Sequence, residues 1–181
     1  DALNQPLSRL MWHGEEAELT RTENAQPAIM AASIAVWRTL SSQGGGSLAQ
    51  TAAHVAGHSL GEYSALCAAG SFSLRETARL PCVIANDNAP GQVVISGAAA
   101  AVEQALEAAK ASGAKRSVIL NVSAPFHSPL MKSAARIMEQ ALRETELASP
   151  APVLIANVTA RPERDPEAIR SLLAEQVTGR V

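Results

Sequence analysis

Cysteine and aromatic residues are scarce in this chain of 181 residues. The two cysteines, Cys67 and Cys82, are too few for a disulfide framework, and neither lies in a Cys/His cluster with metal-ligand spacing. Such usage is typical of a reducing compartment, so we expect a cytoplasmic protein. Phe, Tyr and Trp make up only 3% of the residues while alanine is abundant, which favours helices packed through small side chains over an all-β sandwich.

Long apolar runs and an excess of charge are also missing. No stretch reaches the roughly 18 apolar residues that cross a bilayer, and residues 1–10 lack the basic and apolar regions of a signal peptide. Fifteen Lys plus Arg against 17 Asp plus Glu leave a net charge of -2, so we expect neither a nucleic acid nor a membrane as partner. The sequence holds no P-loop or dinucleotide fingerprint, and we expect no metal and no bound cofactor.

Hydrophobic periodicity and turn residues predict an α/β fold. The predicted helices cover 26–40, 62–69, 98–111, 129–142 and 165–177, with a loop over 41–53. The predicted strands cover 55–56, 82–84, 92–95, 117–122 and 153–158, with a turn at 86–91. The order over 82–122 resembles a β-α-β-β-α-β unit without its opening strand and helix. The missing elements would fall between Leu80 and Pro81.

A G-x-S-x-G motif at 57–61 lies between a predicted strand and a predicted helix. In this nucleophile-elbow pattern, glycines on both sides relieve crowding on a strained turn, so that the serine hydroxyl projects into a cleft. Ser59 is therefore the candidate nucleophile, and a chance match in a loop is the alternative. The amide of Leu60, at the start of the following helix, is suited to stabilising an oxyanion.

A serine nucleophile needs a base, and the chain has four histidines. His13 fits a solvated helix surface, and His54 fits the end of a strand. His58 adjoins Ser59, but neighbouring side chains on an extended segment point in different directions, so His58 is better placed to line the pocket. His127 lies in a loop fixed by two prolines, which suits a catalytic side chain. We therefore predict that His127 is the base.

An aspartate that could complete a Ser-His-Asp triad is hard to find, since the chain has only Asp1, Asp87 and Asp165. Asp87 satisfies the Ser-Asp-His order of α/β-hydrolases but lies in a predicted turn. Asp165 is explained as the N-cap of a helix. If neither orients His127, another acceptor such as a backbone carbonyl must do so, and the site is a Ser-His dyad.

Several longer blocks carry a more specific signal than the pentapeptide. They read, in chain order, TENAQPAIMAAS, GHSLGEYSALCAAGSFSL, IANDNAPGQVVISG, NVSAPFHSPLM and ANVTA followed by EQVTGRV. Together they resemble the malonyl-CoA:acyl-carrier-protein transacylases of fatty acid synthesis. The resemblance implies a ping-pong acyltransferase, in which a serine takes malonyl from coenzyme A as an ester and passes it to the phosphopantetheine thiol of acyl carrier protein. We expect a cytoplasmic monomer.

The resemblance also implies roles for individual residues. Ser59 matches the acyl-accepting nucleophile, His127 the general base, and Leu60 the residue whose amide forms half of the oxyanion hole. Gln176 matches the position whose main-chain carbonyl supports the histidine, which would explain the lack of a suitable aspartate. His58 matches a pocket-lining, substrate-binding histidine.

The implied fold has two parts. Residues 1–80 and 123–181 would form an α/β-hydrolase-like catalytic subdomain with a mainly parallel sheet. Residues 81–122 would form part of a ferredoxin-like small subdomain. Both parts are expected to be incomplete in this chain.

Two departures from the family pattern stand out. Family members begin with a strand and a glutamine-containing loop that supplies the second oxyanion donor, and they carry an arginine that pairs with the malonyl carboxylate. Neither is found here, since Arg75 and Arg79 precede the expected position. We therefore expect segments to be absent before the first residue, between Leu80 and Pro81, and after the last residue.

Two other functions stay open. The same Ser-His pair would serve a serine esterase or thioesterase, in which water attacks the acyl-enzyme. Alternatively, the chain is a non-catalytic fragment that binds carrier protein, which the absent arginine favours. Carrier proteins are typically acidic, so binding one needs a local basic surface. The candidate residues for that surface are Lys110, Lys115, Arg116, Lys132 and Arg136.

Overall fold

The computed structural model describes residues 5–44, 47–72, 87–89, 92–120, 122 and 124–181. The helices of these residues are α1 (Leu7–His13), α2 (Glu16–Leu19), α3 (Thr22–Ser42), α4 (Leu48–Thr51), α5 (Leu60–Ala68), α7 (Ala99–Ala111), the 3-10 turn η1 (Pro129–Met131), α8 (Lys132–Glu144) and α9 (Pro166–Glu175). The strands are β1 (His54–Val55), β2 (Asp87–Ala89), β3 (Gln92–Val93), β4 (Val153–Ala156) and β5 (Arg161–Glu163).

The main sheet has the order β1-β4-β5. Strand β1 runs parallel to β4, with Val55 opposite Leu154, and β5 returns antiparallel to β4. Because the carboxyl ends of parallel strands meet at one edge of a sheet, the turn that follows β1 lies beside the residue that follows β4. That residue is Asn157.

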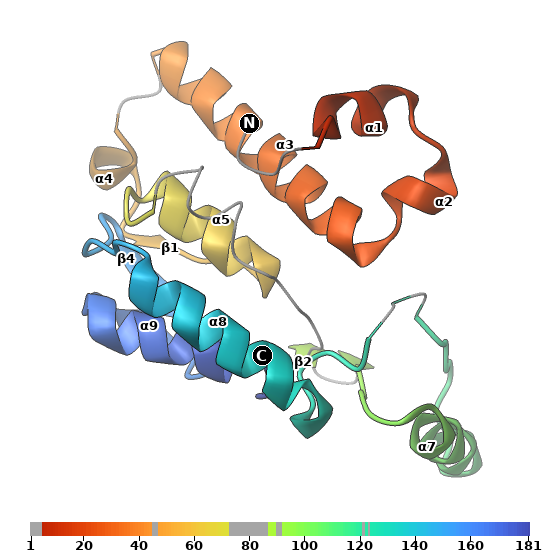
Figure 1. Cartoon of the computed structure of the whole chain (residues 1–181). Coiled ribbons are helices and arrows are strands. Elements are labelled where there is room, and N and C mark those ends of the chain that lie inside the picture. The colour runs from red at the N-terminus through yellow and green to blue at the C-terminus, as the bar shows by residue number, and fades with distance from the viewer. Residues whose placement is uncertain (1–4, 45–46, 73–86, 90–91, 121, 123) are drawn as a thin grey trace.

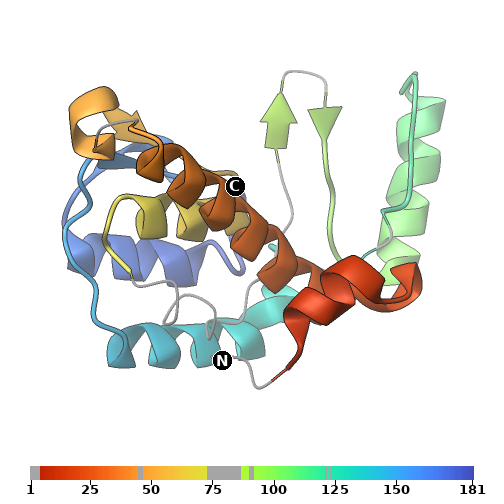
Figure 2. The same cartoon turned by 90° about the horizontal axis from the view of Figure 1, so that it is seen from above.

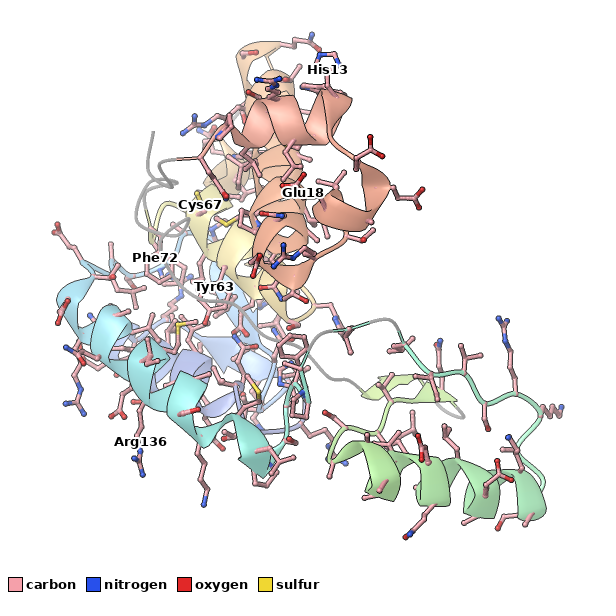
Figure 3. All side chains as sticks on the ribbon, turned by 45° about the vertical axis from the view of Figure 1, so that its right-hand side comes forward. His13, Glu18, Tyr63, Cys67, Phe72 and Arg136 are labelled. Carbon is pink, nitrogen blue, oxygen red and sulfur yellow. The ribbon has the colours of Figure 1, made fainter. Side chains whose placement is uncertain are left out.

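The core lies between α5, β4, α8 and α9. Its largest buried apolar side chains are Tyr63, Leu66, Phe72, Met138, Leu142, Leu154, Ile169 and Leu173. Figure 1 shows α3 packed along α5, with α8 and α9 side by side below them. In Figure 3, Tyr63 and Phe72 lie between α5 and α8, whereas Arg136 extends from α8 away from the core.

The predicted helix ends agree with local chemistry. The Asp165 side chain accepts a hydrogen bond from the Glu167 amide at 3.2 Å, which caps α9 as predicted. Helices α5 and α7 are each followed by a glycine with positive φ, Gly70 at 78° and Gly113 at 90°. A left-handed residue there ends a helix, and glycine adopts that conformation without strain.

The small hairpin differs from its prediction. Strand β2 pairs antiparallel with β3, so residues 87–89 are strand rather than part of a turn over 86–91. The predicted strand at 82–84 and the predicted break between Leu80 and Pro81 lie outside the described residues. Figure 2 shows the hairpin and α7 projecting from the rest of the molecule.

The predicted strand at 117–122 was wrong for the residues that the structure describes. Residues 117–120 and 122 are assigned to no strand, and Val118, Ile119 and Leu120 are more than half exposed. A strand needs a neighbour for its backbone hydrogen bonds, and no described strand pairs with this segment. High β-propensity alone therefore did not make a strand.

Three local features escaped the sequence analysis. Strand β5 contains Pro162, which is tolerated because β5 is an edge strand but which obscures the strand signal. The single turn α4 lies within the predicted loop over 41–53, and a capping box between Ser47 and Gln50 stabilises its N-terminus. Pro27 lies inside α3, because that helix begins at Thr22 rather than near residue 26.

The described part of the chain contains no helix that is both long and apolar enough to cross a membrane.

Leu173→Ala should lower the free energy of unfolding by about 2–5 kcal/mol, since this α9 side chain is 0% exposed and its removal leaves a cavity in the core. The matched control is Leu130→Ala, where the leucine is 59% exposed and the change should stay within about 0.5 kcal/mol. Urea unfolding of both variants measures the difference, and equal losses would contradict this core.

Candidate active site

Ser59 lies at the sharp junction between β1 and α5 and is 1% exposed. Its φ of 51° and ψ of -107° are strained for a residue with a side chain. The turn is tight on one side only. A Cβ at Gly57 would collide with the carbonyl group of Gly61, whereas a Cβ at Gly61 would meet nothing within 4 Å beyond its chain neighbours and the backbone of its own helix. The first glycine of the motif is therefore required for close backbone approach, and the second is not.

His127 comes from a loop that is far away in sequence. Its ring Nε2 lies 3.3 Å from Ser59 Oγ, and the residue is 9% exposed with a φ of 53°. The loop is shaped by two short hydrogen-bonded turns, from the Phe126 amide to the Ala124 carbonyl at 3.0 Å and from Ser128 Oγ to the Pro125 carbonyl at 2.6 Å. The structure thus brings together the predicted nucleophile and the predicted base.

The other ring nitrogen of His127 is held by main-chain carbonyls. Nδ1 is hydrogen-bonded to the carbonyl oxygen of Gln176 and, at 2.9 Å, to that of Gly179. A carbonyl oxygen only accepts, so the proton of neutral His127 resides on Nδ1 and Nε2 carries the lone pair. That tautomer accepts the hydroxyl proton of Ser59. Asp165 is occupied as the α9 N-cap, so within the described residues the arrangement is a Ser-His dyad oriented by carbonyls.

Burial is the main influence on the titration of His127. Removal of the imidazolium from water lowers its pKa below the usual 6.5, and the nearby His58 lowers it further. The carbonyls of Gln176 and Gly179 raise the pKa in the opposite direction but less strongly than burial lowers it. His127 is therefore neutral at neutral pH, as a base must be.

The remaining predicted residues lie around this pair. Leu60 is the first residue of α5, so its amide has no partner within the helix. His58 is exposed and lines a hollow of about 330 Å³ together with Gly57, Asn157 and Ala160. His13 and His54 are exposed and are not joined to the pair. Figure 3 shows His13 at the outer end of α1.

Asn157 was not among the predicted site residues. Its side-chain Oδ1 accepts a hydrogen bond from the Ser59 amide at 2.8 Å. The available signal was its position directly after the buried strand β4, at the edge of the sheet where the Ser59 turn also lies. In the part of the chain that the structure describes, no group of three or more His, Cys, Asp or Glu side chains is arranged to hold a metal ion.

Comparison with known proteins gives consistent relatives. Residues 4–85 match the acyl transferase domain family. The malonyl CoA-acyl carrier protein transacylase of Bacillus subtilis strain 168 is 36% identical over 219 residues, which cover 98% of this chain and 68% of the relative. The crystal structure of an acyl-carrier-protein-S-malonyltransferase from Bartonella henselae superposes with a TM-score of 0.94 at 47% identity, covering all of this chain and 70% of the other.

A third similar structure is a complex. It contains a malonyl-transacylase bound to its type II PKS acyl-carrier protein, and it matches with a TM-score of 0.85 at 35% identity, covering 100% of this chain and 71% of that one. The B. subtilis alignment runs over 219 residues, whereas this chain has 181, a difference of 38. At least that many positions in the aligned part of the relative have no counterpart here.

Gly57→Ala should disable the turn, because the new methyl group must push against the backbone of Gly61. We expect a loss of about 1–3 kcal/mol in unfolding free energy and a fall of about 100-fold in the rate at which a fluorophosphonate probe labels Ser59. The matched control is Gly61→Ala, which should keep or slightly raise stability, since alanine favours the helix by up to about 1 kcal/mol. A harmful Gly61→Ala together with a harmless Gly57→Ala would contradict the geometry.

Labelling of Ser59 by the same probe should show an acid limb below pH 6.5, because protonated His127 cannot accept the serine proton and burial lowers its pKa. His127→Gln should slow labelling by about 100- to 10,000-fold and abolish that acid limb. His13→Gln, at an exposed site, serves as the control and should change neither. Complete loss of labelling with a midpoint well above 6.5 would point to another base.

Proposed function

The chain belongs to the family of the malonyl CoA-acyl carrier protein transacylases, and we propose that it moves a malonyl group from malonyl-CoA to the phosphopantetheine thiol of an acyl carrier protein. The observation that carries this proposal is the buried contact of 3.3 Å between Ser59 Oγ and His127 Nε2. A serine-centred acyl transfer requires such a pair. The relatives are transacylases that act on malonyl CoA and acyl carrier protein, which indicates the acyl group and the acceptor.

In the first half of the reaction, His127 Nε2 takes the hydroxyl proton as Ser59 Oγ attacks the thioester carbonyl of malonyl-CoA. The tetrahedral intermediate carries its negative charge on the former carbonyl oxygen, where the Leu60 amide at the start of α5 donates. The C–S bond then breaks, and the leaving thiolate takes the proton from His127. Free coenzyme A departs, and malonyl remains as an ester on Ser59.

The second half runs the same proton path in reverse. His127 takes the thiol proton of the carrier phosphopantetheine as the sulfur attacks the serine ester. The ester C–O bond breaks, and the alkoxide of Ser59 recovers the proton from His127. In both halves the carbonyls of Gln176 and Gly179 stabilise the imidazolium at Nδ1, a role that an aspartate has in the Ser-His-Asp triad. His58 lines the substrate side of the site. The proposed chemistry needs no bound cofactor beyond its two substrates, the thioester malonyl-CoA and the thiol of the carrier.

The carrier protein is expected to meet exposed basic side chains. Lys132 and Arg136 line a hollow of about 290 Å³ between α8 and α9, where Glu139 and Glu175 also lie. The other basic candidates, Lys110, Lys115 and Arg116, are exposed at and after the end of α7. In the α7 group, Lys110 is paired with Glu107 at 2.7 Å, so Lys115 and Arg116 are the members with which an acidic carrier would interact.

The same proposal divides the chain as its sequence suggested. Residues 1–80 and 123–181 would form the catalytic subdomain, and 81–122 would belong to the small one. The projection of α7 and the β2-β3 hairpin away from the main sheet supports this division (Figure 2). A cytoplasmic location and a monomeric state stay predictions.

Incubation with malonyl-CoA should leave one malonyl ester on Ser59, detected by peptide mass spectrometry, and the ester should be absent from Ser59→Ala. Addition of a phosphopantetheinylated carrier protein should discharge the ester to malonyl-carrier faster than free malonate appears. The structural reason is that His127 Nε2, which lies 3.3 Å from Ser59 Oγ, is also the base for a bound thiol.

Two results would replace the proposal. Faster release of malonate than of malonyl-carrier would indicate a thioesterase. Carrier binding with no ester at any time would indicate a non-catalytic binding protein. Acetyl-CoA, offered in parallel, measures whether the enzyme prefers a carboxylated acyl group.

A further inference from the structure

Glu62 is a buried carboxyl group that the reaction above does not use. It lies on α5, three residues after Ser59, and is 1% exposed. No described Lys, Arg or His side chain forms an ion pair with it. Burial of a carboxylate that has no ion-pair partner is costly unless hydrogen bonds compensate for the lost water.

The partner of Glu62 is Asn157. The Asn157 side-chain Nδ2 donates to Glu62 Oε2 at 2.7 Å, and the Asn157 backbone amide donates to Glu62 Oε1 at 3.4 Å. The same Nδ2 donates to the Gly57 carbonyl at 2.8 Å, while Oδ1 accepts from the Ser59 amide at 2.8 Å. Asn157 therefore joins the carboxylate to both sides of the strained turn.

The carboxylate determines which way the Asn157 amide group faces. If the amide were reversed, its oxygen would lie against the Gly57 carbonyl and the Glu62 carboxylate, and its NH₂ group would face the Ser59 amide. An ionised carboxylate only accepts hydrogen bonds, so it favours the orientation in which Nδ2 points at Glu62 and Oδ1 at Ser59. The Ser59 backbone, at φ 51°, persists only when its surroundings hold it.

We propose that Glu62 and Asn157 are positioning residues, which act by holding the Ser59 turn in its reactive conformation. This inference rests on the proposed function only because its test measures the proposed reaction, the acylation of Ser59 by malonyl-CoA. The interaction requires both oxygens of the Glu62 side chain to accept a hydrogen bond from Asn157. A protonated carboxyl or an amide at position 62 carries a hydrogen on one of the two atoms, and that hydrogen would point at an N–H group of Asn157.

The charge of Glu62 changes near neutral pH. Burial raises its pKa to about 7, while the two Asn157 hydrogen bonds lower it less strongly. Helix α3 and strand β4 pack on α5, and the buried residues of α3 are neutral while β4 carries no titratable side chain. Two histidines lie at the same turn: His58, which precedes Ser59, and His127, whose Nε2 lies 3.3 Å from Ser59 Oγ.

The test is the pH dependence of Ser59 acylation by malonyl-CoA in the full chain. The wild type should lose part of its rate in a step near pH 7 and the rest in a second step below 6.5, where His127 protonates. Glu62→Gln should lack the first step and show a lower kcat, by up to about 100-fold. Its KM should stay unchanged, since the side chain lies beneath the turn rather than in the substrate path.

The Asn157→Asp variant and the double variant test the pairing. Asn157→Asp removes the donor and places two carboxyl groups in contact, so it should be slower than Glu62→Gln. Combining it with Glu62→Gln restores a donor-acceptor pair and should recover part of the rate relative to Asn157→Asp alone. Glu103→Gln, at an exposed glutamate of α7, is the control and should match the wild type throughout.

A wild-type profile with only the step below 6.5 would overturn the proposal, as would Glu62→Gln with a wild-type profile and kcat. The wild-type profile decides the question even if a variant fails to fold. Labelling of Ser59 by a fluorophosphonate repeats the measurement without an acyl substrate. If labelling shows both steps but malonyl-CoA does not acylate Ser59, the positioning role stands and the proposed function falls.

Discussion

The close approach of Gly57 to Gly61 is the constraint on which the site depends. It lets the chain leave β1, turn within a few residues and begin α5 directly after Ser59. The hydroxyl therefore lies at the carboxyl edge of the sheet, with a helix N-terminus immediately behind it. The parallel pairing of β1 with β4 then brings Asn157 to the same edge. A longer or looser turn would separate the nucleophile from both.

The way in which His127 is oriented distinguishes this site from a triad. Two carbonyl dipoles replace a carboxylate, so the imidazolium that forms during proton transfer is stabilised without a buried negative charge beside it. The base consequently keeps a lowered pKa, set mainly by burial. Both acceptors come from residues at and after the end of α9, so the packing of α9 on α8 has a direct effect on the tautomer of the ring.

Much of the fold and of the site could be predicted from the sequence, because the relevant signals are local. The Ser59 motif and the Asp165 cap each depend on neighbouring residues, and both lie where expected. Apolar periodicity was less reliable: in α3, Ile34 is buried, but Ile29 is 58% exposed and Leu40 is 55% exposed. Which apolar side chains of a helix are covered depends on where its neighbours lie in the fold. Asn157 was missed for the same reason, since its importance arises only from the pairing of two strands far apart in the sequence.

The backbone conformations of Ser59 and His127 are needed for the chemistry of this site but lower the stability of the folded chain. Both residues have a positive φ, at 51° and 53°, a conformation that glycine adopts with less steric strain than serine or histidine. Selection for a more stable chain would therefore favour glycine at the two positions that supply the nucleophile and the base. Engineering that selects only for folding stability would therefore replace these two residues, and the resulting stable variants would lack the nucleophile and the base.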